Sequence, residues 1–315
     1  VGAILVMANE LSLAAMIAAA LLMQRTTSPV DQFTSTLSNW NSIKAAFARI
    51  NDLLKENENI LSEKNYLNKD EDTKKFSVVD AKKLSVEIDD NLILDNINLT
   101  FKAGEVTAIL GATGSGKTTL SKILVGIWNK YDGSVEYDKV DIKKLHHDDF
   151  SKIVGYLPQA VMLYGASVSE NIASMRIPNA TRVIEVAKMV GIHDFILKLP
   201  KGYDTFVNSG TTSFSGGERQ RIGIARAIYN DPNFIVLDEP NSSLDQNGEK
   251  ALANVLNIYK EKGSVIVVIS HRRSILESVD NVVRIARGKI LLTEKKDVYI
   301  KQLQKSNEKE TGKKQ

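Results

Sequence analysis

The chain of 315 residues contains no cysteine, which excludes disulfide bonds, thiolate metal sites and a cysteine nucleophile. Its four histidines, His146, His147, His193 and His271, are too scattered along the chain to indicate a zinc site. The net charge of +3 is too small to imply a nucleic-acid partner. What remains, 43% hydrophobic and 25% charged residues, is the ordinary composition of one or two globular domains.

No basic residue precedes the apolar N-terminal segment, Val1 to Met23, so a secretory signal peptide is disfavoured. Asn9 and Glu10 interrupt this segment, and a carboxylate at the centre of a bilayer costs about 2.5–3.5 kcal/mol. We therefore expect one membrane helix to end at Ala8 and another to begin near Leu11. The alternative is a buried helix of a water-soluble domain.

Beyond Pro29, hydrophobic residues recur at steps of three and four, a period typical of a long helix packed along a neighbour. Pro29 itself predicts a kink. Residues 56–75 are charged and rich in asparagine, and they predict a linker. We expect residues 1–55 to be the end of a membrane domain with a cytoplasmic helical extension. The periodic positions are Val30, Phe33, Leu37, Trp40, Ile43, Phe47, Ile50 and Leu54.

From Phe76 onward the pattern is that of an α/β domain, which we place at residues 76–300. The turn-forming residues 89–91 separate two short strands and predict a hairpin. Later apolar strands alternate with helical segments, which predicts a mostly parallel, buried sheet. The polar residues 301–315 predict a disordered tail. The expected strands are residues 84–88, 92–101, 106–110, 234–237 and 265–269.

The first chemical motif is a glycine-rich loop, residues 111–118, which follows an expected strand and opens a helix. Backbone N–H groups of such a loop curl around phosphates, and the helix N-terminus adds its dipole. Lys117 is expected on the β- and γ-phosphates of ATP, and Thr118 on a magnesium ion. The residues predicted to hold the nucleotide here are Gly111, Thr113, Gly114, Ser115, Gly116, Lys117, Thr118 and Thr119.

An acidic pair, Asp238-Glu239, ends the apolar strand at residues 234–237. In phosphoryl transfer the first carboxylate can bind magnesium, and the second can orient and deprotonate the attacking water. Alone, such a pair could be a turn. Beside a phosphate loop it predicts ATP hydrolysis, with Asp238 as metal ligand and Glu239 as base.

Together with four further motifs, these residues resemble the nucleotide-binding domain of ABC transporters. Ser215-Gly216-Gly217-Glu218 resembles the family signature, which caps the γ-phosphate held by a second copy. Gln159 matches the residue that senses magnesium and contacts the membrane domain. Residues 242–245, ending in Asp245, match the loop that crosses the dimer interface, and His271 matches a histidine on the γ-phosphate. The resemblance implies a P-loop ABC ATPase fold with an antiparallel β subdomain and a helical signature subdomain.

Three stretches are also similar to type I secretion permease/ATPases of the protease and lipase exporter branch: residues 16–32, residues 191–205 and Asp238-Glu239-Pro240-Asn241. This resemblance implies a half-exporter in the bacterial inner membrane, with its ATPase domain on the cytoplasmic face. Two copies would pair head to tail around ATP and Mg²⁺. It further implies a periplasmic adaptor (membrane fusion) protein, an outer-membrane channel and an unfolded protein as the exported substrate.

The chain departs from the family pattern at several places. Val86 stands where an aromatic residue usually stacks on adenine, which predicts weaker base stacking. Glu218 replaces the commoner glutamine, and residues 207–210 lack an acidic residue often seen in exporters. Most of the family's membrane helices do not precede this ATPase domain. We therefore expect the C-terminal portion of a longer transporter.

Three alternatives stay open. An exporter of lipid or peptide shares every ATPase motif. A remnant that binds nucleotide without transport would explain the missing helices, although Glu239 and His271 favour hydrolysis. An ABC ATPase acting on DNA or ribosomes would carry coiled-coil inserts or tandem ATPase domains, and the sequence has neither.

Overall fold

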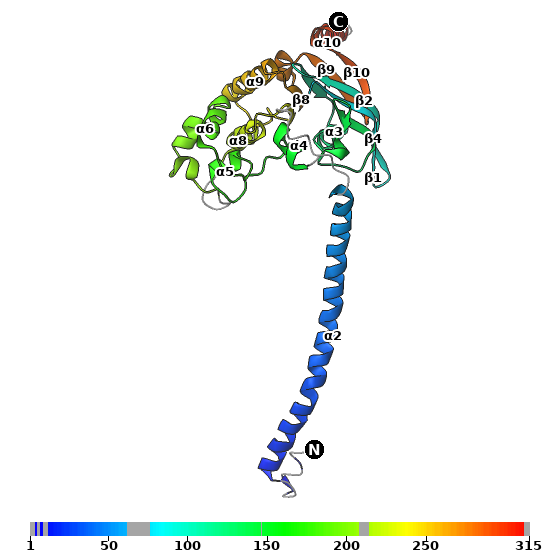
Figure 1. Ribbon diagram of the computed structural model, residues 1–315, viewed down its shortest axis with the longest axis vertical. Helices are drawn as coiled ribbons and strands as arrows, with labels where there is room; N and C mark the ends of the chain where they lie inside the picture. Colours follow the sequence, from blue (N-terminus) through cyan, green and yellow to red (C-terminus); the bar gives the residue numbers. More distant parts are fainter. Residues whose placement is uncertain are drawn as a thin grey trace. The chain divides into compact units, whose positions relative to one another are not determined.

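The computed structural model describes residues 4, 7–8, 12–61, 76–145, 147–207 and 214–311. Contacts divide the chain into two units, Val1–Glu63 and Lys64–Gln315 (Figure 1). The first unit is a single long helix over most of its described length, and the second is a globular α/β domain. This boundary falls inside the segment that the sequence predicts to be a linker.

The first unit consists mainly of helix α2 (Leu13–Leu61), which is 49 residues and roughly 73 Å long. The helix continues through Pro29, because one proline removes a single backbone hydrogen bond. It also extends to Leu61, beyond the predicted linker start at residue 56, and residues 62–75 lie outside the described part. No helix among the described residues combines the length and apolar character needed to cross a membrane, so the predicted span is not shown.

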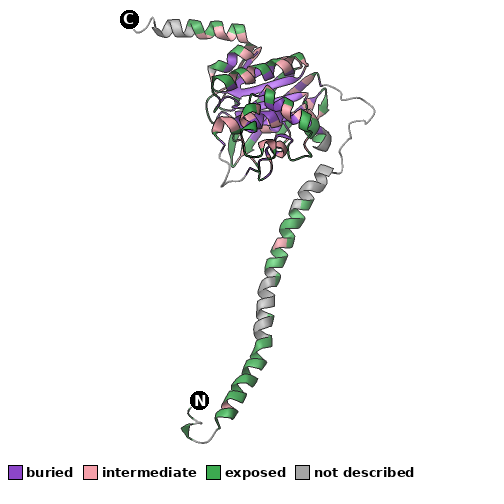
Figure 2. Cartoon of the chain, turned by 90° about the vertical axis from the view of Figure 1, so that its left-hand side faces the viewer, coloured by how far each residue is buried: buried purple, intermediate pink, exposed green. Residues whose placement is uncertain are grey.

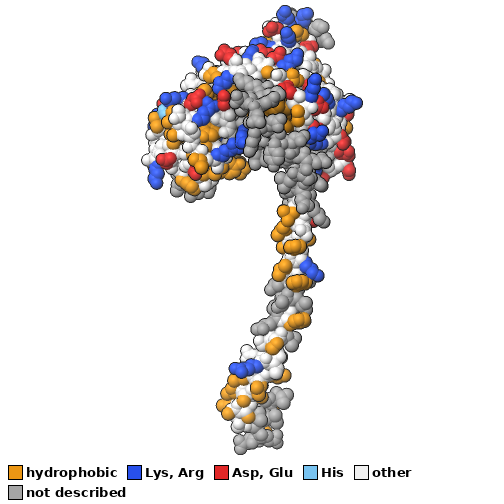
Figure 3. Space-filling model, viewed as in Figure 1, with side chains coloured by type: hydrophobic (Ala, Val, Ile, Leu, Met, Phe, Trp, Pro, Cys, Tyr) orange, Lys and Arg blue, Asp and Glu red, His pale blue; other side chains and the backbone are white. Residues whose placement is uncertain are grey.

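Large hydrophobic side chains of α2 are exposed along its length (Figures 2 and 3). Beyond Pro29 they occupy periodic positions noted in the sequence, and in no described residue of α2 is the side chain buried. The stripe is therefore without a covering partner among the described residues of this single chain. Its described members are Phe33, Trp40, Ile43, Phe47, Ile50 and Leu54.

The globular unit begins with an antiparallel sheet in the order β2-β1-β4-β5. The hairpin of β1 and β2 is confirmed, and Ile88 pairs with Asn91 across its turn. Asp89 and Asp90 have φ of 49° and 61° in this turn, which suits a two-residue hairpin loop. The strands are β1 (Val78–Ile88), β2 (Asn91–Lys102), β4 (Asp132–Tyr137) and β5 (Val140–Asp141).

The second sheet has six strands in the order β10-β9-β3-β8-β7-β6. Its pairs are parallel except β9 with β10, so the predicted mostly parallel sheet is confirmed. All residues of β7 and β8 are buried, which explains their continuous apolar runs. The strands are β3 (Val106–Leu110), β6 (Val154–Leu157), β7 (Phe234–Asp238), β8 (Val265–Ser270), β9 (Asn281–Ala286) and β10 (Lys289–Lys295).

This sheet separates two hydrophobic cores. Phe234 and Val236 of β7 pack into one core with the antiparallel sheet, whereas Ile235 and Leu237 pack into the other with the helices. The alternation follows from the two-residue period of a strand. The helices are α3 (Lys117–Leu124), α4 (His147–Ile153), α5 (Val168–Ile172), α6 (Ala180–Met189), α7 (His193–Leu197), α8 (Gly216–Ile228) and α9 (Gln246–Glu261), with 3₁₀ turns η1 (Ile142–Lys144), η2 (Gly202–Asp204) and η3 (Arg273–Ser278).

The C-terminal segment forms helix α10 (Lys296–Thr311), where the sequence predicted a disordered tail from residue 301. Tyr299 and Leu303, four residues apart on one helix face, pack against the helical core. Within the predicted tail, Leu303 is the single apolar residue of the sequence, which was too weak a pattern to indicate this helix. Residues 312–315 lie outside the described part.

Candidate nucleotide and magnesium site

The phosphate loop connects the buried strand β3 to helix α3, as the sequence predicts. Gly116 caps α3 with φ of 93°, and a Cβ atom there would lie 2.8 Å from the Ile93 carbonyl oxygen. At Gly111 a Cβ atom would lie 2.3 Å from the Ile285 carbonyl oxygen. Glycine is therefore required at both positions, because each contact is to backbone that cannot give way.

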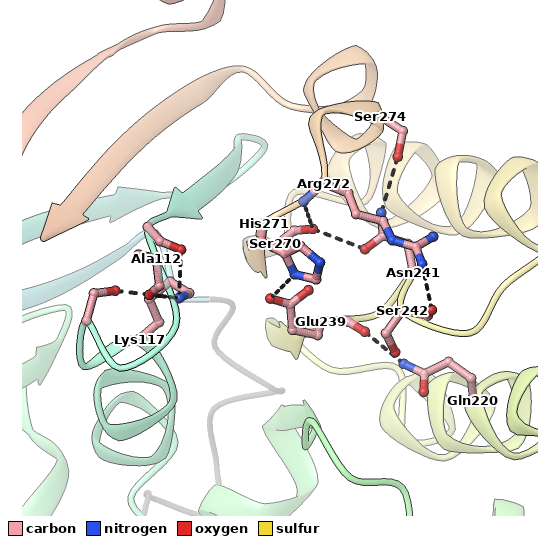
Figure 4. A network of polar contacts seen from close by, with 12 residues as sticks. Ala112, Lys117, Gln220, Glu239, Asn241, Ser242, Ser270, His271, Arg272 and Ser274 are labelled. Atoms are coloured by element: carbon pink, nitrogen blue, oxygen red, sulfur yellow. Dashed lines mark hydrogen bonds and ion pairs between the residues drawn. The ribbon is translucent and has the colours of Figure 1, made fainter.

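Lys117 is buried at the start of α3, and its Nζ donates to the carbonyl oxygens of Gly111 and Ala112 at 2.9 and 2.8 Å (Figure 4). These bonds hold the ammonium inside the loop that it closes. Burial lowers the pKa of Lys117, while the nearby charges of Glu239 and Asp238 oppose that shift. The amine is thus aimed at the place where the loop would receive a phosphate.

Asp238 ends β7 with no exposed surface. Its Oδ2 accepts from the Ser121 hydroxyl at 3.4 Å, and its Oδ1 is buried without a hydrogen-bond partner among the described residues. Burial raises the pKa of Asp238, against hydrogen bonding from Thr118 and Ser121 and the charge of Lys117. An orphaned buried carboxylate oxygen beside a threonine hydroxyl fits a magnesium ion, whose ligands are oxygens.

Glu239 follows Asp238 in a left-handed conformation, with φ of 53°. Such a backbone costs about 1–3 kcal/mol in a residue other than glycine and marks functional sites. Oε1 of Glu239 lies 2.8 Å from Nδ1 of His271, while Oε2 is buried and unpartnered among the described residues. His271, which follows β8, has 62% of its side chain exposed and therefore lies at the mouth of the site (Figure 4).

Residues 240–243 are tied to the end of β8 by a polar network that the sequence did not predict. Asn241 is buried, accepts from the Ser270 hydroxyl at 3.1 Å and donates to Ser274 Oγ at 3.2 Å. Arg272 donates to the Ser242 carbonyl oxygen at 2.8 Å (Figure 4). Because these bonds join separate parts of the chain, only a structure could reveal them.

The signature begins helix α8, as expected. Ser215 Oγ accepts from the Glu218 N–H at 3.3 Å, and Glu218 Oε2 accepts from the Ser215 N–H at 2.7 Å. This is a capping box, in which each residue satisfies a backbone donor of the other. The Glu218 carboxylate, predicted as a nucleotide contact, is therefore engaged within its own helix, and the Ser-x-x-Glu spacing could have indicated this.

Two further predicted residues lie on other elements than the phosphate loop. Gln159 is exposed in the bend after β6. Asp245 caps helix α9, accepting from the Gly248 N–H at 2.8 Å and pairing with Arg221. Among the predicted site residues, the structure brings Lys117, Thr118, Asp238, Glu239 and His271 together through these bonds and charges, with Ser115 contacting Lys117 at 3.5 Å.

The position expected to stack on adenine is closed to solvent. Val86 is 2% exposed and belongs to the core beneath the antiparallel sheet. It therefore offers no face to a base in this conformation. Thr113 is exposed in the phosphate loop and Thr119 is half-buried in α3. Residues 208–210, where an acidic residue is missing, lie outside the described part.

The ABC transporter family profile matches residues 94–242. The chain is similar to the type I secretion system ATP-binding protein PrsD of Rhizobium meliloti, at 35% identity over 294 residues, covering 92% of this chain and 49% of that protein. It is also similar to an ATP-dependent lipid A-core flippase of Syntrophus aciditrophicus, at 36% identity over 214 residues, covering 68% of this chain and 35% of the flippase.

Among solved structures, a bacterial Atm1-family ABC exporter with ATP bound superposes with a TM-score of 0.68 at 25% identity, over 80% of this chain and 45% of that one. The chain thus spans about half the length, or less, of the relatives it matches. The region that matches the family profile, residues 94–242, contains the phosphate loop, the signature and the acidic pair. The chain belongs to the ABC transporter family, and its globular unit is the ATPase domain of that family.

Proposed function

We propose that this chain hydrolyses ATP to drive export across the bacterial inner membrane, as the ATPase part of a half-exporter that works as a head-to-tail pair. The observation that carries the proposal is the Glu239–His271 hydrogen bond of 2.8 Å beside Lys117 and Asp238. It places a buried carboxylate with one free oxygen next to a phosphate loop. A remnant that only bound nucleotide would need no such base.

Each residue has a distinct part in this proposal. Lys117 binds the β- and γ-phosphates, and Glu239 accepts a proton from the attacking water at its free Oε2. His271 holds Glu239 through Oε1 and faces the γ-phosphate from the mouth of the site. Thr118 and Asp238, with Gln159, would hold magnesium, which when bound neutralises charge on the phosphates.

Hydrolysis needs a second copy in this proposal. The start of α8, Ser215 to Gly217, presents backbone N–H groups to the γ-phosphate held by the partner copy. Asp245, at the start of α9, lies in the loop that meets the partner. Closure of the two copies on ATP would move the helices that lead into the membrane, and hydrolysis would reset them.

For the cargo we propose an unfolded protein exported through a type I secretion system, with a periplasmic adaptor and an outer-membrane channel. The support is the match to PrsD, which extends over 92% of the chain and so includes most of α2. The flippase match covers only 68%. Lipid export is the second candidate, because that relative is slightly more identical over the region it covers.

The cargo is tested by deleting the encoding gene and comparing secreted proteins and outer-membrane lipids with those of the parent strain. Loss of a secreted protein that the intact gene restores supports protein export. An unchanged set of secreted proteins with an altered outer-membrane lipid composition supports the flippase-like alternative. No change in either contradicts export and favours the remnant.

Hydrolysis is tested with the full chain by measuring ATP turnover against protein concentration, for wild type and Glu239→Gln. We expect wild-type activity to rise faster than linearly with concentration, and turnover of Glu239→Gln to fall by about 10²-fold or more, because the amide cannot accept the proton. Glu239→Gln should also elute as a dimer in saturating ATP. Glu185→Gln, which alters a partly exposed ion pair with Arg182, is the matched control and should keep its turnover.

Two outcomes contradict the proposal. If the wild-type chain shows no activity at any concentration, it does not hydrolyse ATP. Glu239→Gln with wild-type turnover assigns the base to another group.

A further inference from the structure

The polar contacts around Glu239 include one from the signature helix itself. Gln220, one turn into α8, is 4% exposed, and its Nε2 donates to the Glu239 carbonyl oxygen at 3.1 Å (Figure 4). Gln220 lies outside the motifs from which the sequence predicted the site. A buried amide that bonds to the main chain of the proposed base therefore needs an explanation.

The backbone of Glu239 is held on every side. Its N–H donates to the Ile269 carbonyl oxygen at 2.8 Å, and its carbonyl oxygen accepts from the Ser242 N–H at 3.2 Å as well as from Gln220. A left-handed glutamate is strained, and such a conformation persists only where neighbours over-determine it. The direction of the Glu239 side chain, and so its bond to His271, depends on that backbone.

Gly216 and Gly217 of the signature pack against Ser243, which follows Glu239 in the chain. A Cβ atom at Gly217 would lie 2.9 Å from the Ser243 carbonyl oxygen, and one at Gly216 would lie 3.2 Å from Ser243 Oγ. These close approaches place the first turn of α8 directly against Ser243. Gln220 adds a directional bond one turn further along, so that α8 contacts both ends of the segment from Glu239 to Ser243.

We propose that Gln220 is a positioning residue, which couples the placement of the signature helix to the orientation of the base Glu239. The inference rests on the proposed function, since it takes Glu239 as the base and the start of α8 as the contact to the partner's nucleotide. A shift of α8 on meeting that nucleotide would then be carried to Glu239 of the same copy. The bond thus links the ATP at one site to the base at the other.

Kinetics of the full chain test this coupling. Gln220→Met keeps the length of the side chain and removes its donor, so we expect kcat to fall by about tenfold or more, as a small misplacement of a catalytic group does. The dissociation constant for ATP should stay within about twofold of wild type, because the side chain of Gln220 bonds to the main chain of Glu239 and not to the phosphate loop. The Hill coefficient for ATP should also fall.

The matched control is Ser264→Ala. Ser264 is 4% exposed, and its hydroxyl donates to the Pro232 carbonyl oxygen at 3.0 Å, near the opposite end of β7 from Glu239. Like Gln220→Met, Ser264→Ala removes a hydrogen bond from a buried side chain to a main-chain carbonyl oxygen. Ser264→Ala should lower Tm without lowering kcat at a temperature where both variants are folded. An equal loss of kcat in both variants would overturn the positioning role.

A spectroscopic readout separates failure of this inference from failure of the proposed function. The Nδ1 chemical shift of His271 reports its hydrogen bond to Glu239 without any hydrolysis. In Gln220→Met we expect that shift to move toward its value in Glu239→Ala, while Ser264→Ala leaves it unchanged. If wild type proves inactive, the proposed function fails and this shift alone decides the inference. An unmoved shift overturns the coupling, whatever the activity.

Discussion

Two aspartates of the globular unit show how environment decides the behaviour of one residue type. Asp238 is fully buried at the end of a central strand, and burial raises its pKa. Asp245 caps an exposed helix start, where the Gly248 N–H and then Arg221 lower its pKa. The sequence placed both in the nucleotide site but could not separate their electrostatics, because burial is a tertiary property.

We predict that Asp238→Asn raises the Tm of the nucleotide-free chain at pH 7 in the presence of a chelator. A raised pKa means that the folded state binds more protons, so ionised Asp238 lowers the free energy of unfolding above the folded pKa. The gain should shrink as pH falls through the folded pKa and vanish below the unfolded value. Thermal unfolding from pH 7 downward measures it, since 1 kcal/mol corresponds to about 2–4 °C in a domain of this size.

Asp245→Asn is the control, because the pKa of Asp245 is shifted in the opposite direction to that of Asp238. Its lowered pKa contributes stability that is present above the unfolded value and is lost as pH falls through the folded value. The variant should therefore have a lower Tm than wild type at pH 7, and the difference should fade on acidification. Stabilisation of both variants at pH 7 would show that removal of any acidic charge suffices, which contradicts a specific burial effect at Asp238.

At this scale the sequence indicated the residues with chemical motifs and missed those with structural partners. Lys117, Asp238 and Glu239 were found because phosphate binding and proton transfer require those residue types after a strand. Gln220 and Ser270 were missed because a buried amide or hydroxyl has no local pattern. Their roles depend on which backbone atoms the fold brings within hydrogen-bond distance.

At the scale of elements, β3, β7 and β8 were predicted best, whereas β1 begins at Val78 and not at the predicted residue 84. The central strands are buried on both faces, so their residues are continuously apolar and their bounds were correct to within a residue. Helix α10 was missed because its contacts with the helical core come from Tyr299 and Leu303, and two such positions form no long apolar pattern. The long helix was expected from its stripe, although its end at Leu61 was not, because the run of polar residues 55–59 interrupts the stripe before that end.

Helices α5 and α8 each begin with a capping box, and these allow a matched prediction. Ser215 and Glu218 cap α8, while Ser167 and Glu170 cap α5 with the same reciprocal bonds. Ser215→Ala and Ser167→Ala should each lower the free energy of unfolding by about 1 kcal/mol, because one backbone donor loses its partner. Chemical denaturation of the full chain measures both.

The two variants should differ in hydrolysis. Ser215 lies in the proposed contact with the partner's nucleotide, so Ser215→Ala should lower turnover, whereas Ser167→Ala should leave turnover unchanged at a temperature where it is folded. Glu218→Gln should retain both stability and turnover, because glutamine also completes a capping box. Equal turnover in the two alanine variants would argue that the signature serves only as a helix start.

At the scale of the whole molecule, the two units differ in their hydrophobic cores. The buried hydrophobic residues among the described part all lie between Phe76 and Ile285. No described side chain of helix α2 is among them, and the described members of its stripe are exposed. A long helix outside a core gains little from its own backbone hydrogen bonds, since tertiary packing supplies most helical stability in proteins.

We therefore predict that residues 64–315 alone unfold cooperatively, with a Tm within about 2–4 °C of the full chain, the shift that 1 kcal/mol would produce. Differential scanning calorimetry of both proteins measures this, and the shorter chain should keep its calorimetric enthalpy. A much lower Tm or a broad transition would mean that α2 stabilises the domain, and the division into two units would then be wrong. Because the exposed stripe goes with α2, the shorter chain should also bind less detergent, which ties the apolar surface of the full chain to that helix.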